Sequence, residues 1–204
     1  MVKLVATDMD GTFLTSKGFY DNQRLHNVLE KFEKNDMLFV AASGRSMLAL
    51  EKMFAPHADK MAFIAENGTL VKVGEKTVFE SGLTKPQFLE IIDTLIESPY
   101  MTGYDFLLSG ENGAYLHPKA SDEYLEFISH YYENVQRVDN LANVTDNILK
   151  VTANFAEDTV RKGEAWFNQR IDYVKAVTTG FKSIDIILSD VNKRTGLEAL
   201  CESF

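Results

Sequence analysis

Short apolar runs alternate with amphipathic segments over the first third of the chain. The runs at 2–6, 37–42 and 62–65 have the length and the β-branched or aromatic content of strands that are covered on both faces in a parallel sheet. Residues 22–34 place apolar side chains at helical spacing, and 47–54 is predicted as a second helix. The pattern predicts right-handed βαβ units, and hence an α/β fold in which the first strand is buried.

The pattern changes near Leu83. A helix is predicted after Thr84, and strands and helices then follow one another up to residue 188. We interpret 83–188 as a second α/β unit inserted into the first, with the chain returning to the first unit at 189–204. A single continuous sheet is the alternative. The expected strands of the insert lie at 104–108, 114–117, 148–155, 173–178 and 184–188, and its helices at 84–97, 121–133 and 157–169.

Composition and charge narrow the function classes. The 204 residues are 45% hydrophobic and 25% charged, which is ordinary for a globular protein of one large or two small domains. The formal net charge of −9 argues against nucleic-acid and anionic-membrane surfaces, although a local metal ion and a few cations can still hold a phosphate. The single cysteine, Cys201, excludes an intramolecular disulfide, and no signal peptide or membrane span is predicted, so we expect a cytoplasmic protein.

Two carboxylates at the end of the first predicted strand are the strongest candidates for chemistry. Asp8 and Asp10 are followed by Gly11, which lets the chain turn tightly. Ligands of α/β sheets bind beyond the carboxyl ends of the strands, and two acids this close favour a cation between them or a proton on one of them. A calcium loop fits less well because its twelfth position is Phe19, and a hairpin turn at Asp10-Gly11 is a further alternative.

The second predicted strand ends at Ser43, Gly44 and Arg45, directly before the helix at 47–54. A hydroxyl and a glycine at such a turn suit an anion, because the N–H groups of the first helical turn face outward and carry the positive end of the helix dipole. The sequence therefore predicts a phosphate site here. Ser43 could instead do no more than cap the helix.

Two further polar positions are open to more than one interpretation. Asn67-Gly68 lies between apolar runs and is a typical hairpin signal. Lys193 lies in the first turn of the last predicted helix, which Asp190 or Asn192 would cap. A cation at that position runs against the helix dipole and so hints at use, but a solvated lysine would be the ordinary explanation.

The segment Asp8-Met9-Asp10-Gly11-Thr12 resembles the first motif of the haloacid dehalogenase superfamily. The segments at Ser43 and Lys193 resemble its second and third motifs, and Arg45 and Asn67 resemble positions of its Cof-type phosphatase branch. The resemblance implies an α/β, Rossmann-like core with a parallel sheet and an inserted α/β cap domain of the large type IIB. The expected domains are the first part of the core at 1–82, the cap at 83–188 and the return segment of the core at 189–204.

The resemblance also implies roles for these residues. Asp8 becomes the nucleophile that forms an aspartyl-phosphate, Asp10 the general acid and base, and both become ligands of Mg²⁺. The implied substrate is a small phosphorylated metabolite such as a sugar phosphate, with no nucleic-acid or membrane partner. Phosphate contacts are implied for Thr12, Ser43, Gly44 and Lys193, and weaker substrate contacts for Arg45 and Asn67.

One motif of the family is not found. A Gly-Asp-x-x-x-Asp segment should follow the Lys193 helix, but the sequence ends at Phe204, roughly 60–70 residues short at ordinary element lengths. We therefore expect a C-terminally truncated core with fewer acidic magnesium ligands and with activity in doubt. The primary hypothesis is a phosphatase, and the alternatives are a phosphosugar mutase of the same superfamily or an inactive phosphate-binding remnant. The sequence predicts neither the oligomeric state nor the cap residues that select the substrate.

Overall fold

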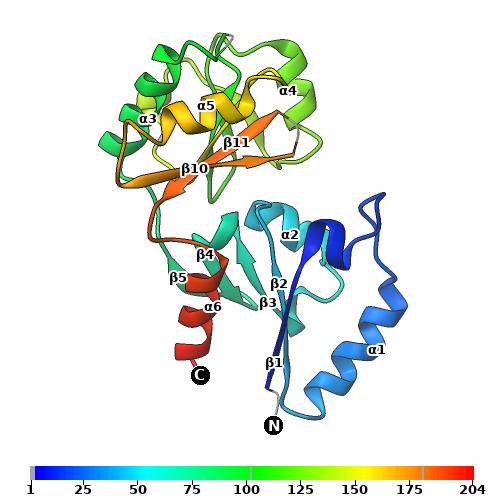
Figure 1. Ribbon diagram of the computed structural model, residues 1–204. Helices are drawn as coiled ribbons and strands as arrows, with labels where there is room; N and C mark the ends of the chain where they lie inside the picture. Colours follow the sequence, from blue (N-terminus) through cyan, green and yellow to red (C-terminus); the bar gives the residue numbers. More distant parts are fainter. Residues whose placement is uncertain (1–2, 102, 181) are drawn as a thin grey trace. The chain divides into compact units, whose positions relative to one another are not determined.

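The computed structural model describes residues 3–101, 103–180 and 182–204. The chain forms two compact units (Figure 1), which we call unit 1, Met1–Glu80 with Val191–Phe204, and unit 2, Ser81–Asp190. Each has its own sheet, of five strands in unit 1 and six in unit 2, so the alternative of one continuous sheet is wrong. No helix among the described residues is both long and apolar enough to span a bilayer.

The sheet of unit 1 has the strand order β1-β2-β3-β4-β5. Its first three strands run parallel, with Asp8 opposite Ala42 and Ala42 opposite Ile64, so their carboxyl ends lie at one edge of the sheet. The last two strands are antiparallel to their neighbours. The bounds are β1 Leu4–Asp8, β2 Leu38–Ala42, β3 Met61–Ala65, β4 Leu70–Val73 and β5 Lys76–Glu80.

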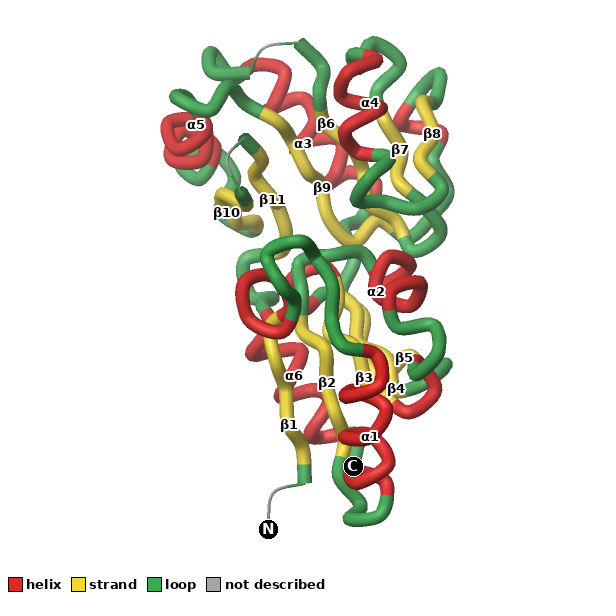
Figure 2. The backbone as a smooth tube through the Cα atoms, turned by 90° about the vertical axis from the view of Figure 1, so that its right-hand side faces the viewer, coloured by secondary structure: helices red, strands yellow, loops and turns green. Residues whose placement is uncertain are grey.

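Helices pack on both sides of this sheet (Figure 2). The helices α1 (Asn22–Glu33) and α2 (Met47–Met53) contact β2 and β3, whereas α6 (Lys193–Glu202) contacts β3, β4 and β5. Alternate residues of each strand pack against the helices on opposite sides of the sheet, because successive side chains of a strand point to opposite faces. Val40, Ala62 and Ile64 pack with Leu200 of α6, and the rings of Phe54 and Phe63 meet on the other side at 6.0 Å.

The first strand differs from its prediction. It was predicted from Val2 onward, a residue outside the described part, and β1 begins at Leu4. Its prediction as a buried strand is wrong, because Val5 is 37% exposed and Ala6 is exposed too. In the described part of the chain β1 pairs only with β2, so it is an edge strand with one side open to water.

Unit 2 has a sheet with the strand order β10-β11-β9-β6-β7-β8, antiparallel except for the parallel pair β7 and β8. The helices α3 and α5 pack with Phe106 and Leu108 on one face, and α4 packs with Leu107 and Leu116 on the other. The bounds are α3 Lys85–Glu97, β6 Phe106–Gly110, β7 Ala114–Leu116, α4 Asp122–Ile128, β8 Val135–Arg137, β9 Ile148–Asn154, α5 Val160–Phe167, β10 Val174–Thr179 and β11 Ser183–Leu188.

Candidate active site

The two carboxylates of the first motif sit on either side of a buried anchor. Asp8 ends β1, and Asp10 lies in the turn Met9–Phe13, whose Met9 is fully buried. Gly11 has a φ of +76°, the left-handed conformation that glycine adopts without a Cβ clash, and Leu14 N–H donates to Met9 O at 2.9 Å. This closed turn replaces the hairpin considered from the sequence. It leaves the side chains of Asp8 and Asp10 42% and 60% exposed, and Thr12 exposed on the same turn.

Lys193 reaches the first motif from the far end of the sequence. It is the first residue of α6, and its ammonium group donates to Asp8 Oδ1 across 185 residues of chain. Asn192 caps the helix by accepting from the N–H groups of Arg194 and Thr195. The cation is therefore not a solvated lysine at a helix end but the partner of the Asp8 carboxylate.

Glycine lets the start of α6 come this close to the sheet. Gly68 has a φ of +115°, and a Cβ there would lie 2.2 Å from the carbonyl oxygen of Asn192. One turn into the helix, a Cβ at Gly196 would lie 2.9 Å from Cγ2 of Ile64. Real Cβ atoms do not make contacts this short. The helix α6 can therefore take this position only because Gly68 and Gly196 have no side chain. The contact at Gly68 fixes the backbone that carries Lys193.

Ser43 and Gly44 form a second polar edge beyond β2. Ser43 is 1% exposed, and its Oγ accepts from the backbone N–H of Arg45 at 3.2 Å. Because this bond uses Oγ as acceptor, the hydroxyl can still donate its proton to an anion. The cap of α2 is Ser46, whose Oγ accepts from Ala49 N–H at 3.3 Å, so the capping alternative for Ser43 is wrong.

The structure places Asn67 both in a hairpin turn and beside the predicted phosphate site. The turn Glu66–Gly68 joins β3 to the antiparallel β4, as the hairpin signal predicts. The same turn brings the side chain of Asn67 to Gly44, where a Cβ would lie 2.8 Å from Asn67 Oδ1, and Asn67 N–H donates to Ser43 O at 3.0 Å. Asn67 is thus a neighbour of the predicted phosphate site.

Arg45 makes a contact that sequence reasoning missed. Its Nε donates to Asp10 Oδ2 at 3.0 Å and its terminal nitrogen to Oδ1 at 2.6 Å, a two-point ion pair that fixes the orientation of the carboxylate. No spacing rule links a residue after β2 to one after β1. The parallel register that aligns the two strand ends brings Arg45 and Asp10 together.

Glu66 is a second residue that sequence reasoning missed. Its carboxyl group is fully buried in the turn after β3, and its φ of +50° is unusual for a residue with a side chain. Its backbone N–H donates to Arg45 O at 2.9 Å, which ties the turns after β2 and β3 together. Only the Asn-Gly that follows it gave a local signal for a left-handed turn.

Asp8 and Asp10 carry the type of ligand atom, oxygen, that Mg²⁺ prefers. Asp8 and Asp10 offer carboxylate and carbonyl oxygens, and Mg²⁺ is commonly held by one or two carboxylates together with waters and substrate phosphate. No cluster of three or more acidic, histidine or cysteine residues suited to a metal occurs among the described residues. The buried carboxylate of Asp185 is no candidate ligand, because it lies in unit 2 in an ion pair with Lys150 at 3.1 Å.

The comparison with known sequences decides the family. The sequence model of the haloacid dehalogenase-like hydrolases matches residues 5–204. The chain belongs to this family. Among curated proteins it is similar to the 5-amino-6-(5-phospho-D-ribitylamino)uracil phosphatase YbjI of Escherichia coli, with 32% identity over 200 residues, 98% of this chain and 73% of that protein.

Other proteins of known structure share the fold. SMU.1108c of Streptococcus mutans superposes with a TM-score of 0.90 at 26% identity, over 100% of this chain and 76% of that one. The sugar phosphatase BT4131, described as a subclass IIB member of the haloacid dehalogenase superfamily, superposes with a TM-score of 0.78 at 14% identity over 100% and 76%. The predicted superfamily, its Cof-type branch and the α/β core-plus-cap fold class are thereby confirmed. The predicted enzyme class, phosphoric monoester hydrolase, is confirmed at the same level, and membership of this family implies a divalent metal at the site.

Proposed function

We propose that this haloacid dehalogenase-like protein is a Mg²⁺-dependent phosphatase of small phosphorylated metabolites, sugar phosphates among them, that works through an aspartyl-phosphate. One observation carries the proposal: the Lys193 ammonium meets Asp8 at a strand end, two residues before a second carboxylate. The Escherichia coli relative supports the substrate class, because its name describes a phosphate ester on a ribityl chain.

Asp8 is the proposed nucleophile. Its oxygen attacks phosphorus in line, the new bond is Oδ–P, and the bond that breaks joins phosphorus to the alkoxide of the substrate. The covalent intermediate divides one difficult displacement into two easier ones. The Lys193 ammonium orients the Asp8 carboxylate and places positive charge where phosphoryl oxygens gather.

Asp10 is the proposed general acid and base. It donates a proton to the departing alkoxide and then removes a proton from the water that attacks the aspartyl-phosphate, so that the proton count balances over the cycle. The two-point contact from Arg45 holds the Asp10 carboxylate in one orientation. Because its side chain is 60% exposed, Asp10 remains accessible to a leaving group and to water.

The phosphoryl oxygens are bound by groups from separate elements. The proposed donors are the hydroxyls of Thr12 and Ser43, the backbone at Gly44 and the ammonium of Lys193, with Asn67 beside them. The Asp8 carboxylate and the Asp10 carbonyl would hold Mg²⁺, which would neutralise charge on the phosphoryl group. Since these groups recognise only phosphate, we assign the choice of the alcohol part to unit 2, acting as the cap.

Hydrolysis of p-nitrophenyl phosphate tests the proposal. We expect Mg²⁺-dependent release of orthophosphate that ends when EDTA removes the metal and returns when Mg²⁺ is restored. Asp8→Asn should reduce the rate to background, and mass spectrometry of the acid-quenched wild type should find a phosphoryl group on the peptide with Asp8. With glucose phosphates, orthophosphate rather than an isomeric ester should appear. A folded, metal-loaded chain that releases no phosphate would refute the proposal.

A further inference from the structure

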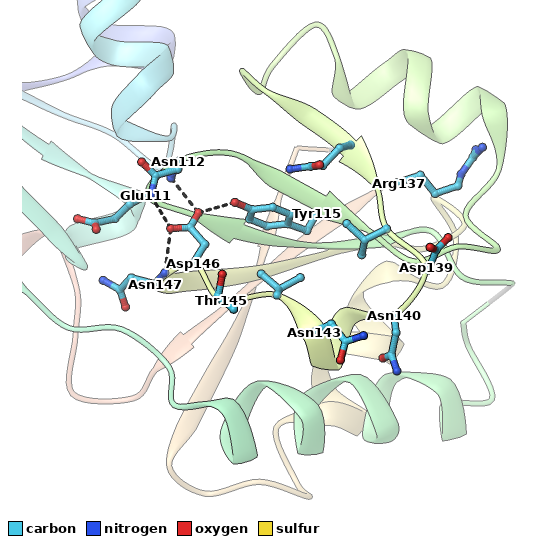
Figure 3. Close-up of a pocket in the computed structure, with 13 residues that line it drawn as sticks. Glu111, Asn112, Tyr115, Arg137, Asp139, Asn140, Asn143, Thr145, Asp146 and Asn147 are labelled. Carbon is cyan, nitrogen blue, oxygen red and sulfur yellow. Dashed lines mark hydrogen bonds between the residues drawn. The ribbon is translucent and has the colours of Figure 1, made fainter.

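Unit 2 contains a hollow that the proposed phosphatase chemistry does not use. It has a volume of about 770 Å³, within the range of about 300–1,000 Å³ usual for small-ligand sites, and lies beside β7, β8 and the loop before β9 (Figure 3). All its lining residues fall between Glu111 and Asn147, so it belongs to unit 2 alone. None of the predicted site residues lines it.

One wall of the hollow is built around the carboxylate of Asp146. It accepts from the backbone and side-chain nitrogens of Asn112 at 2.9 and 2.8 Å, from the Tyr115 hydroxyl at 2.8 Å and from Asn147 N–H at 2.9 Å (Figure 3). A Cβ at Gly110 would lie 2.1 Å from Asp146 Oδ2, so only glycine admits the carboxylate here. Burial and the bond to Asp146 raise the pKa of Tyr115 to about 12, so its hydroxyl remains a donor well above neutral pH. The wall is pre-organised.

The exposed lining of the hollow is mostly polar, but it includes three residues with apolar or aromatic surface. Val138, Val144 and Tyr115 line it and pack against the main core of unit 2. Its edge is rich in side-chain amides, from Asn112, Gln136, Asn140, Asn143 and Asn147.

The side-chain amides and charged groups that line the hollow indicate which class of ligand it binds. An amide offers both a donor and an acceptor, so it matches groups that do the same, and hydroxyls are the common ones. Three carboxylates, Glu111, Asp139 and Asp146, oppose one guanidinium, Arg137, which is itself paired with Asp122 at 2.8 Å. This balance disfavours a phosphate ester. The four bonds accepted by Asp146 also make it a poor partner for a cationic amine.

We propose that this hollow is a binding site for a neutral polyhydroxylated compound, a sugar or a sugar alcohol, separate from the phosphate site of unit 1. The side chains of Val138, Val144 and Tyr115 suit the carbon face of such a ligand, and the side-chain amides that line the hollow suit its hydroxyls. The hollow should bind neutral sugars or sugar alcohols and should not bind their phosphate esters. The proposal does not depend on phosphatase activity.

Chemical-shift mapping on the full ¹⁵N-labelled chain tests the proposal. D-glucose, D-ribose and D-sorbitol are titrated separately, and glucose 6-phosphate and putrescine serve as charged comparisons. The phosphate ester is added to the Asp8→Asn variant so that it is not consumed. We expect at least one neutral compound to shift amides at 111–115 and 136–147 in a saturable manner, while glucose 6-phosphate leaves the amides of these two segments unshifted.

Two variants probe the hollow itself. Thr145→Trp adds bulk on an exposed lining residue, and Asp146→Asn removes a charged acceptor from the wall. Each should weaken binding at least about tenfold, as expected for a lost contact worth roughly 1.4 kcal/mol. The controls Glu157→Trp and Asp158→Asn make the same kinds of change at exposed positions of unit 2 outside the hollow, and they should bind as the wild type does. Absence of saturable shifts, binding undisturbed by Thr145→Trp, or equal binding of glucose 6-phosphate or putrescine in the hollow would overturn the proposal.

Discussion

Neighbouring cations at the start of α6 have different partners. The ammonium of Lys193 meets Asp8, whereas Arg194 pairs with Glu198 on its own helix at 2.8 Å, with an 84% exposed side chain. The difference follows from the helix geometry, since consecutive residues point about 100° apart. The proposed mechanism therefore depends on one of the two cations only.

We predict that Lys193→Ala lowers kcat/KM for p-nitrophenyl phosphate by about 10²–10³-fold, the usual loss when one electrostatic contact to a transition state is removed. Lys193→Arg should recover only part of the rate, because a planar guanidinium does not replace a compact ammonium. Arg194→Ala is the matched control and should retain the wild-type rate, because its exposed ion pair with Glu198 lies away from Asp8. Steady-state kinetics on variants with unchanged circular dichroism measure the effect, and equal losses in both alanine variants would contradict this role.

At the scale of whole elements, three strands with similar apolar runs had two different outcomes. The runs at 37–42 and 62–65 became β2 and β3 within one residue of their predicted bounds, because strands covered on both faces must be apolar throughout. The run at the N-terminus looks the same, yet among the described residues β1 pairs with β2 alone. Apolar content does not reveal whether a strand has one neighbour or two.

Short elements gave too little pattern to predict. The strand β8 has three residues, Val135–Arg137, and is mostly exposed, and β5 (Lys76–Glu80) carries charged residues at both ends. The helix α4 ends at Ile128 rather than at 133, and Ser129 at its end donates from Oγ to Leu125 O at 2.7 Å.

Some features of the candidate site could be predicted from the sequence, and others needed the structure. Asp8, Ser43 and Lys193 could be proposed through a family resemblance, whereas the pairing of Arg45 with Asp10 needed the strand register. The contact between Gly68 and the start of α6 joins residues about 125 positions apart, and no local pattern signals it.

The close contact between Gly68 and the start of α6 predicts that one added methyl group lowers the stability of the protein strongly. Gly68→Ala should destabilise the protein by about 2–5 kcal/mol, from roughly 1–2 kcal/mol of backbone strain at positive φ and about 1–3 kcal/mol of overpacking against Asn192. Gly18→Ala is the control, since Gly18 also has a positive φ, +77°, but no atom lies within 4 Å of its added Cβ. It should lose only the strain term. Urea unfolding gives both values, and a Gly68 variant no less stable than the Gly18 variant would show that α6 can move away at little cost.

For the whole molecule, the two units have separate cores and the proposed catalytic residues all belong to unit 1. Unit 2 instead buries an ion pair, Lys150 with Asp185, at 1% and 7% exposure, and Thr152 donates to the same carboxylate at 2.9 Å. Removing one partner of such a pair leaves a charge stranded in a medium of low polarity, which costs more than the pair itself contributes. The stability of unit 2 should therefore depend on both partners being kept or both being replaced.

We predict that Asp185→Ala destabilises unit 2 by about 3–5 kcal/mol, whereas the double variant Lys150→Met/Asp185→Leu, with apolar side chains of similar size, regains most of that loss. Amide hydrogen exchange followed by mass spectrometry measures each unit by itself. Protection should fall in β9 and β11 of the single variant, while β2, β3 and α6 keep their wild-type protection because their core is separate. A uniform loss across both units would instead mean that the chain unfolds as one cooperative body, and unit 1 would then depend on unit 2 for its stability.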